Sequence, residues 1–309
     1  MSNILPSDES GLARAEELLR AGQIVAVPTE TVYGLAARAD SEDAVAAIFR
    51  AKGRPSFNPL IVHVSSLEMA RRIARFDARA EALAAQYWPG PLTLVLPLNP
   101  GAEIAPAVTA GLSTIALRMP AHDLTRSLLQ RLELPLAAPS ANRSTGISPT
   151  SAAHVAASLG DRIAGIVDGG ECPRGLESTI VALRDGGMWS LLREGPITRA
   201  QLEAALGSAP VESVAGIEAP GQMARHYSPG KPLRLNALTA TDDEYLIGFG
   251  DVEGDSNLSP SSDLAQAAAR LYACLHEAAA SSRPRIAVAP VPRDAIGAAI
   301  NDRLKRAAA

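Results

Sequence analysis

The stretch that decides how the chain is organised is Ala219-Pro220-Gly221-Gln222-Met223-Ala224-Arg225-His226-Tyr227-Ser228-Pro229-Gly230-Lys231-Pro232. Its prolines and glycines exclude a regular helix or a central strand. The side chains of Arg225, His226 and Tyr227 are those of a functional segment rather than an inert spacer. We therefore predict a working linker over residues 209–232, between a larger domain at 1–208 and a smaller one at 233–309.

On the N-terminal side of this linker, short apolar runs alternate with helical patterns of apolar residues, which predicts an α/β fold with a mixed sheet. The predicted strands are Gln23–Pro28, Pro59–Val64, Leu92–Leu98, Ser113–Met119, Leu134–Ala138, Gly165–Asp168, Ser178–Leu183 and Trp189–Arg193. The predicted helices are Leu12–Ala21, Asp40–Ala51, Leu67–Ala74, Ala78–Tyr87, Asp123–Leu132, Ser151–Leu159 and Thr198–Leu206.

On the C-terminal side, the pattern predicts a small α/β unit. Tyr245–Gly250 and Arg285–Ala289 are the predicted strands, and a helix over Leu264–Ala279 lies between them. A last helix covers Ile296–Arg306, and Asp251–Ser262 is a polar loop.

Composition excludes several functional classes. Hydrophobic residues make up 47% of the 309 residues, which is enough for a core, but no apolar run reaches the roughly 20 residues of a membrane helix. We therefore expect a soluble, cytoplasmic protein that uses no membrane. The two cysteines lack CxxC spacing, and a net charge of −4 with 4% aromatics argues against a dedicated nucleic-acid binder. Any phosphate chemistry must rest on a local cluster of cations.

Standard catalytic motifs are missing from the sequence. It contains no GxxxxGK[ST], GxGxxG, HExxH or GxSxG pattern, and its five histidines lack metal-ligand spacing. We therefore expect no metal site built by the protein itself and no obvious covalent nucleophile.

Two segments that follow regular elements carry polar residues suited to ligand contact. Thr29-Glu30-Thr31-Val32-Tyr33-Gly34-Leu35 comes directly after a predicted strand, where ligands often bind, although a strand exit with capping threonines is the commoner explanation of such a stretch. Lys52 and Arg54 follow a helix C-terminus, which favours cations in any case. Because prolines at 55 and 59 stiffen that segment, a fixed cation pair with Asn58 favours phosphate binding.

Two polar residues stand inside predicted strands. His63, in the run Leu60–Val64, is more often a core residue than a catalyst in such a place. Arg118 shares one face of its strand with Thr114 and needs an anionic partner, because an unpaired buried charge is costly. That partner is either a carboxylate of the protein or the carboxylate of a ligand, and the sequence leaves both open.

Further hydroxyls and cations stand at other strand ends. Ser140-Ala141-Asn142 and Ser148 follow one strand, Glu177-Ser178-Thr179 begins another, and Arg193-Glu194-Gly195 ends a third. Each is an ordinary strand terminus taken alone. Together they predict a pocket that binds an anionic, polyphosphate-bearing ligand and works by positioning it.

These motifs together resemble the YrdC/Sua5 family of threonylcarbamoyl-AMP synthases, and the linker with its following α/β unit resembles the longer, Sua5-type members. The resemblance implies a YrdC-like twisted mixed sheet with flanking helices, followed by a small Rossmann-like C-terminal domain. It implies a nucleotidyltransferase that converts L-threonine, bicarbonate and ATP to threonylcarbamoyl-AMP and pyrophosphate, with Mg²⁺ accompanying ATP. The product would serve a threonylcarbamoyl transferase acting at position 37 of tRNA, so tRNA itself is a weak or indirect partner.

The resemblance also implies roles for individual residues. L-threonine would lie among Thr31, His63, Arg118, Ser178 and the backbone at Ala138, where relatives often have a hydroxyl residue. ATP would lie among Lys52, Arg54, Asn58, Thr114, Ser140, Ser148, Arg193 and Tyr227, with Lys52 and Arg54 as catalytic cations and the linker folded over the nucleotide. The linker departs from the pattern of relatives at 219–224, so its exact contacts stay open.

Two other functions are compatible with parts of the sequence. An RNA-binding module would place Lys52, Arg54 and Arg118 on phosphates, but the acidic net charge and few aromatics oppose it. An enzyme of the same fold acting on carbamoyl phosphate would resemble hydrogenase-maturation proteins, whose zinc-finger cysteines this chain lacks.

Overall fold

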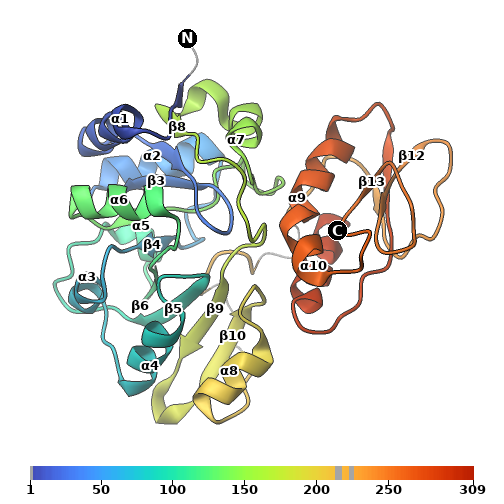
Figure 1. Cartoon of the computed structure of the whole chain (residues 1–309). Coiled ribbons are helices and arrows are strands. Elements are labelled where there is room, and N and C mark those ends of the chain that lie inside the picture. Colours follow the sequence, from blue (N-terminus) through green and yellow to red (C-terminus); the bar gives the residue numbers. More distant parts are fainter. Residues whose placement is uncertain (1–2, 213–217, 223–225) are drawn as a thin grey trace.

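The computed structural model describes residues 3–212, 218–222 and 226–309. Figure 1 shows a larger N-terminal body, coloured blue to yellow, beside a smaller orange and red C-terminal body. Each body has its own sheet, and Arg225 lies outside the described residues. The last helix of the larger body ends at Leu206 and the first strand of the smaller one begins at Leu233, so the boundaries at 208 and 233 stay predictions.

The larger body is built on a ten-stranded mixed sheet in the order β1-β8-β2-β3-β7-β4-β6-β5-β9-β10. Its centre combines antiparallel pairing of β4 with β7 and parallel pairing of β4 with β6. The strands are β1 (Ile4–Leu5), β2 (Val25–Val27), β3 (Gly34–Arg38), β4 (Ile61–His63), β5 (Leu92–Pro97), β6 (Thr114–Arg118), β7 (Leu136–Ala137), β8 (Gly165–Val167), β9 (Thr179–Leu183) and β10 (Trp189–Arg193).

Amphipathic helices cover this sheet. α2, for example, buries Ala44, Val45 and Ile48, starts at the cap Ser41 and ends at Gly53, whose φ of 60° is left-handed. The helices are α1 (Glu9–Arg20), α2 (Glu42–Lys52), α3 (Leu67–Ile73), α4 (Ala78–Tyr87), α5 (Pro106–Thr109), α6 (Asp123–Leu132), α7 (Ala152–Leu159) and α8 (Arg199–Leu206), with 3₁₀ turns η1 (Gly160–Arg162) and η2 (Asp185–Gly187).

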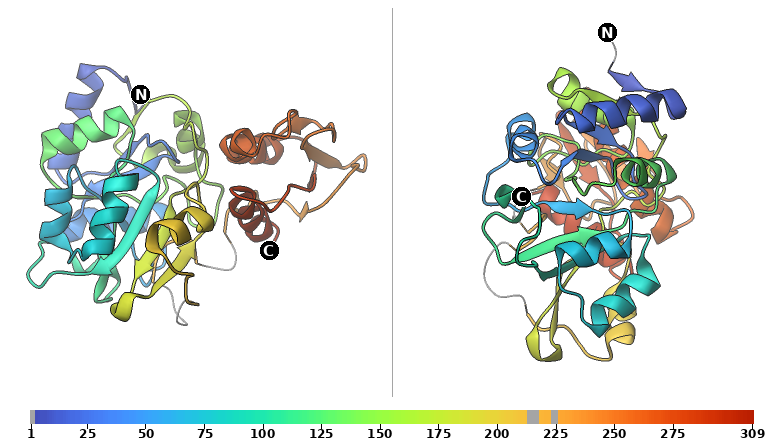
Figure 2. Two further views of the ribbon diagram at one scale, coloured as in Figure 1. Left: turned by 60° about the horizontal axis from the view of Figure 1, so that its bottom comes forward. Right: turned by 90° about the vertical axis from the view of Figure 1, so that its left-hand side faces the viewer.

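The smaller body is an α/β unit with four parallel strands in the order β11-β14-β12-β13. Its helices α9 and α10 face the larger body, and its sheet lies on their far side (Figures 1 and 2). Its elements are β11 (Leu233–Arg234), β12 (Glu244–Gly248), β13 (Ser256–Asn257), α9 (Leu264–Ala280), β14 (Arg285–Val288) and α10 (Gly297–Ala307).

The predicted fold class is confirmed, and each predicted strand and helix is present with small shifts at its ends. The longest element absent from the prediction is the strand Gly34–Arg38, which forms β3 and pairs antiparallel with β2. Residues 28–33 are therefore the loop of a hairpin rather than an exit from the sheet. The elements β1, α5, β11 and β13, of two to four residues each, were also not predicted. No helix in the described ranges is long and apolar enough to cross a bilayer.

Candidate active site

One cavity of about 40 Å³ collects polar residues from distant parts of the chain. Arg54, from the loop after α2, and Arg118, from the end of β6, both line it. It is lined by Thr29, Thr31, Val32, Gly34, Arg54, Ile61, His63, Arg118, Ala138, Pro139, Ser140, Glu177, Ser178, Arg193, Pro220, Gly221 and His226. The site residues proposed from the sequence at 31, 54, 63, 118, 138, 140, 178 and 193 are thus brought together.

His63 and Arg118 are direct partners across the parallel strands β4 and β6. Both side chains are buried, with exposed fractions of 3% and 4%. Burial, with the nearby charge of Arg118, holds the pKa of His63 well below its ordinary value. His63 is therefore a neutral imidazole at pH 7, able to donate one hydrogen bond and accept another.

The protein itself supplies a carboxylate to Arg118. Arg118 Nη2 lies 2.6 Å from Glu30 Oε1, and its Nε donates to the Gly90 carbonyl at 3.2 Å. Although burial opposes it, the charge of Arg118 lowers the pKa of Glu30, whose Oε2 also accepts from the Ala121 amide. Of the two partners that the sequence left open for Arg118, the carboxylate of the protein is therefore present. The side chain of Arg118 nevertheless lines the cavity as well.

The two threonines of the hairpin loop have different surroundings. Thr29 Oγ1 donates to the Val32 carbonyl at 2.6 Å and accepts from the amides of Thr31 and Val32. That is the loop-stabilising role of a threonine in a tight turn. Thr31 Oγ1 lies 2.8 Å from Thr29 Oγ1, and both residues line the cavity.

Ser178 and Arg193 lie at the neighbouring strand ends of β9 and β10 and are joined by hydrogen bonds. Arg193 Nε donates to the Ser178 carbonyl at 2.9 Å, and its Nη2 donates to Ser178 Oγ at 3.0 Å. Ser178 Oγ also lies 2.7 Å from Thr93 Oγ1. Burial lowers the pKa of Arg193, which nevertheless stays a cation at pH 7.

Arg54 turns back over its own loop. Its Nε donates to the Asn58 carbonyl at 3.2 Å and its Nη2 to the Pro59 carbonyl at 2.8 Å. Burial, followed by the charge of Arg193, lowers its pKa to about 10. Within the described residues, neither Arg54 nor Arg193 forms an ion pair with a carboxylate. Two cations thus face one cavity, which is the arrangement that an anionic ligand requires.

The remaining predicted residues are not among those that line the cavity. Lys52 is buried, and its Nζ donates to the carbonyls of Ser140 and Asn142 at 2.6 and 2.5 Å. Asn58 is buried, and Thr114 stands half-buried at the start of β6. Ser148 Oγ donates to Glu177 Oε1 at 2.5 Å, and the fully buried Tyr227 stacks on Tyr272 with ring centroids 5.5 Å apart.

Glu177 and the linker residues Pro220, Gly221 and His226 line the cavity but were not among the site residues assigned from the sequence, which expected the linker to fold over the nucleotide. Pro220, Gly221 and His226 bring the linker to the cavity. Gly221 has φ +84°, and a Cβ there would lie 2.9 Å from Arg193 Cδ, so only glycine allows this approach. Burial lowers the pKa of His226 to about 3. The position of Glu177 directly before Ser178 was the signal that could have indicated it.

The described residues include no cluster of three histidine, cysteine or carboxylate side chains that could hold a metal ion. Fixed guanidiniums, hydroxyls and a neutral imidazole can bind and orient an anionic ligand and stabilise negative charge that develops on it. The site is therefore suited to positioning two reactants rather than to forming a covalent enzyme intermediate.

Known proteins match both bodies of the chain. A family model described as "Telomere recombination" matches residues 17–195, and one described as "Threonylcarbamoyl-AMP synthase, C-terminal domain" matches residues 197–309. A threonylcarbamoyl-AMP synthase of Pyrococcus abyssi is 38% identical over 320 residues, covering 95% of this chain and 92% of that protein. The chain belongs to the threonylcarbamoyl-AMP synthase family.

Other members of this family agree with that assignment. A threonylcarbamoyl-AMP synthase of Bacillus subtilis is 46% identical over 239 residues, which is 75% of this chain and 68% of that protein. The crystal structure of Pyrococcus abyssi Sua5 complexed with L-threonine has a TM-score of 0.90 and 35% identity, covering 99% of this chain and 97% of that one. This confirms the resemblance to the long, Sua5-type threonylcarbamoyl-AMP synthases.

Proposed function

We propose that this threonylcarbamoyl-AMP synthase converts L-threonine, bicarbonate and ATP to L-threonylcarbamoyladenylate, pyrophosphate and water. The threonine amine and bicarbonate combine to an N-carboxylate and release water. An oxygen of the N-carboxylate then attacks the α-phosphorus of ATP, and the bond to the β-phosphate breaks as pyrophosphate leaves. The observation that carries the proposal is the convergence of Arg54, Arg118 and Arg193 on one cavity.

The wall formed by β4, β6 and β9 is the proposed L-threonine site. Arg118 binds the amino-acid carboxylate while Glu30 holds its guanidinium in place. His63, Thr31 and Ser178 offer neutral hydrogen-bonding groups to the rest of the molecule, and Ala138 offers only its backbone. The neutral state of His63 suits this role, since an imidazolium would add a third charge beside Arg118 and Glu30.

The wall formed by Arg54, Arg193 and the linker is the proposed ATP site. The two guanidiniums stabilise the charge that develops on the phosphate oxygens, and Ser140 faces the same space. Lys52 supports this wall by holding the carbonyls of the loop that bears Ser140. The other ATP residues that we propose are Asn58, Thr114, Ser148 and Tyr227.

The size of the cavity bears on how the nucleotide enters. About 40 Å³ is far below the roughly 300–1,000 Å³ of sites that enclose small molecules. Pro220, Gly221 and His226 form part of the present wall. We therefore propose that the linker residues Pro220, Gly221 and His226 move outward to admit ATP and then cover it, excluding water from the mixed anhydride.

Mg²⁺ belongs to this reaction as part of the MgATP substrate. No metal-binding cluster lies among the described residues, and Mg²⁺ commonly binds through substrate phosphates and water. The product would pass to a threonylcarbamoyl transferase that modifies position 37 of tRNA, with tRNA contacting this protein weakly or indirectly. Both steps would take place in the cytoplasm.

The direct test measures pyrophosphate release by the purified protein with ATP, Mg²⁺ and bicarbonate, with and without L-threonine. We expect release only when bicarbonate and L-threonine are both present, together with transfer of labelled bicarbonate carbon into an adenylate. Glycine in place of L-threonine is the matched control for any amine. Pyrophosphate release that is indifferent to bicarbonate or to L-threonine would contradict the assignment.

A further inference from the structure

One carboxylate, that of Glu177, lines the same cavity as Arg54 and Arg193. Glu177 is buried between β9 and the C-terminal body, with an exposed fraction of 5%. Although burial opposes it, the charges of Arg303 and Arg193 lower its pKa to about 2, so it is ionised at pH 7. An ionised carboxylate in this position repels a triphosphate unless another group neutralises it.

The groups that bind Glu177 come mainly from the C-terminal body. Tyr272 on α9 donates its hydroxyl to the carboxylate, with distances of 3.0 and 2.9 Å to its two oxygens. Arg303 on α10 donates from Nε to Oε2 at 3.0 Å. Ser148 is the partner on the N-terminal side. Arg193 and Arg54 instead donate hydrogen bonds to Ser178 and to loop carbonyls.

Arg303 is built into the interface between the two bodies. It is fully buried, and its Nη1 lies 2.6 Å from Asp302 Oδ2 while its Nη2 donates to the Glu194 carbonyl at 2.8 Å. Its guanidinium carbon lies 5.3 Å from the centroid of the Tyr227 ring, which belongs to the linker. A single side chain thus contacts the cavity carboxylate, the end of β10 and the linker.

We propose that Arg303 is a positioning residue for ATP binding: it neutralises Glu177, so that the cavity of the N-terminal body accepts a triphosphate only while the C-terminal body is docked. This inference rests on the proposed function. It assigns the C-terminal body an electrostatic part in nucleotide binding through Glu177. Arg303 itself does not line the cavity.

The test compares the single variants Arg303→Met and Glu177→Gln with the double variant that carries both. ATP dissociation constants and the KM values for ATP and L-threonine are measured on the full chain, after thermal unfolding has established that each variant is folded. We expect Arg303→Met to raise the KM for ATP at least about tenfold, because it leaves Glu177 without its ion-pair partner beside the phosphates. The KM for L-threonine should change less than threefold, and Glu177→Gln should restore ATP binding in the double variant to that of Glu177→Gln alone.

Arg234→Met is the matched control. Arg234 also lowers the pKa of a glutamate, Glu244, to about 2, but neither residue of that pair lines the cavity. We expect it to leave the KM for ATP unchanged.

Three results would overturn the proposal. They are an unchanged KM for ATP in Arg303→Met, equal changes in both KM values, and a double variant as impaired as Arg303→Met. If Arg303→Met does not fold, ATP binding by the double variant is compared with ATP binding by Glu177→Gln alone. Weaker binding by the double variant would show that Arg303 acts other than through Glu177 and would overturn the proposal. A wild-type protein that binds ATP but releases no pyrophosphate with L-threonine would contradict the proposed function. The ATP dissociation constants of the variants would still test the role of Arg303 in that case.

Discussion

The buried arginines on the cavity wall and the buried arginine of the domain interface have opposite surroundings. Arg193 is buried without an ion pair to any described carboxylate, and burial lowers its pKa. Arg303 is buried against Glu177 and Asp302, and although burial opposes it, Tyr227 and these carboxylates raise its pKa. A buried cation with an ion-pair partner in the protein supports structure. Arg193 feels the charge of Glu177 but forms no ion pair with it, so its guanidinium is available to an anionic ligand.

Arg118 lies between these two cases, because it is paired with Glu30 and also reaches the cavity. We expect Arg118→Met to lower the free energy of unfolding by about 3–5 kcal/mol, since it leaves a buried carboxylate without its partner. Chemical denaturation measures this loss. Adding Glu30→Gln should recover most of the stability but not L-threonine binding. A loss below about 1 kcal/mol, which is typical of exposed ion pairs, would contradict the stabilising role of the Arg118–Glu30 pair.

Arg54 is the opposite case, because its partners are carbonyls and its pKa is lowered to about 10. We expect Arg54→Ala to reduce the rate of threonine-dependent pyrophosphate release by ~10²–10³-fold, the usual effect of removing one charge-stabilising donor. The thermal midpoint of Arg54→Ala should stay the same or rise, because the variant no longer bears the unfavourable desolvation of the Arg54 charge. Arg71→Ala, which breaks the exposed pair with Glu81, is the control and should retain full activity. A large fall in the thermal midpoint of Arg54→Ala would place Arg54 among the structural cations.

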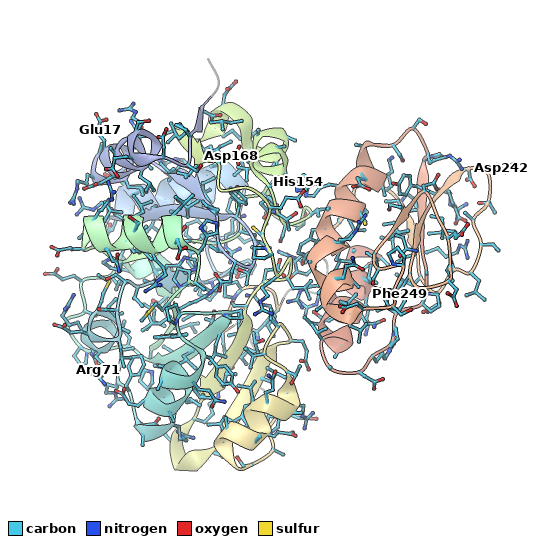
Figure 3. The ribbon with its side chains drawn as sticks, in the orientation of Figure 1. Glu17, Arg71, His154, Asp168, Asp242 and Phe249 are labelled. Carbon is cyan, nitrogen blue, oxygen red and sulfur yellow. The ribbon has the colours of Figure 1, made fainter. Side chains whose placement is uncertain are left out.

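The interface also holds two histidines that stack on each other. His154, labelled in Figure 3, stacks on His276 with ring centroids 3.9 Å apart, and His276 Nε2 lies 3.2 Å from the Ser148 carbonyl. Burial, followed by the charge of His154, lowers the pKa of His276 to about 4. The pKa of a histidine in the unfolded chain is about 6.5, so the unfolded chain takes up this proton at a higher pH than the folded protein does. The contribution of neutral His276 to the free energy of unfolding is therefore complete above pH 6.5 and declines as the pH falls towards 4.

We therefore expect the pair to cost about 1–2 kcal/mol of stability between pH 7 and pH 5. Urea denaturation at the two pH values measures the change in wild type and in His276→Gln, whose amide can still donate to the Ser148 carbonyl. The variant should lose less stability on acidification, while His63 and His226 contribute equally to both proteins. Identical losses would mean that the stacked pair does not control the acid sensitivity of the interface.

The sequence alone determined most of the regular elements and indicated eight of the residues that line the cavity. Local periodicity is sufficient for this: Thr114, Ala116 and Arg118 alternate with apolar residues and form β6, and Gly53 ends α2 in the left-handed conformation it tolerates. Co-occurring motifs then indicated the family. The short strand β3 was missed because Gly34–Arg38 carries no distinct local signal, and its strand state comes from pairing with β2 and β7.

Only the tertiary structure decided which charges meet. Glu30 and Arg118 are 88 residues apart, and Glu177 and Arg303 are 126 residues apart, so neither pair leaves a local pattern in the chain. Nor does the sequence show that Lys52 faces loop carbonyls while Arg54 faces the cavity. The physical reason is that periodicity records which face of an element is buried. The partner of a buried charge depends on which distant surfaces packing brings together, and on the desolvation that then requires them to pair.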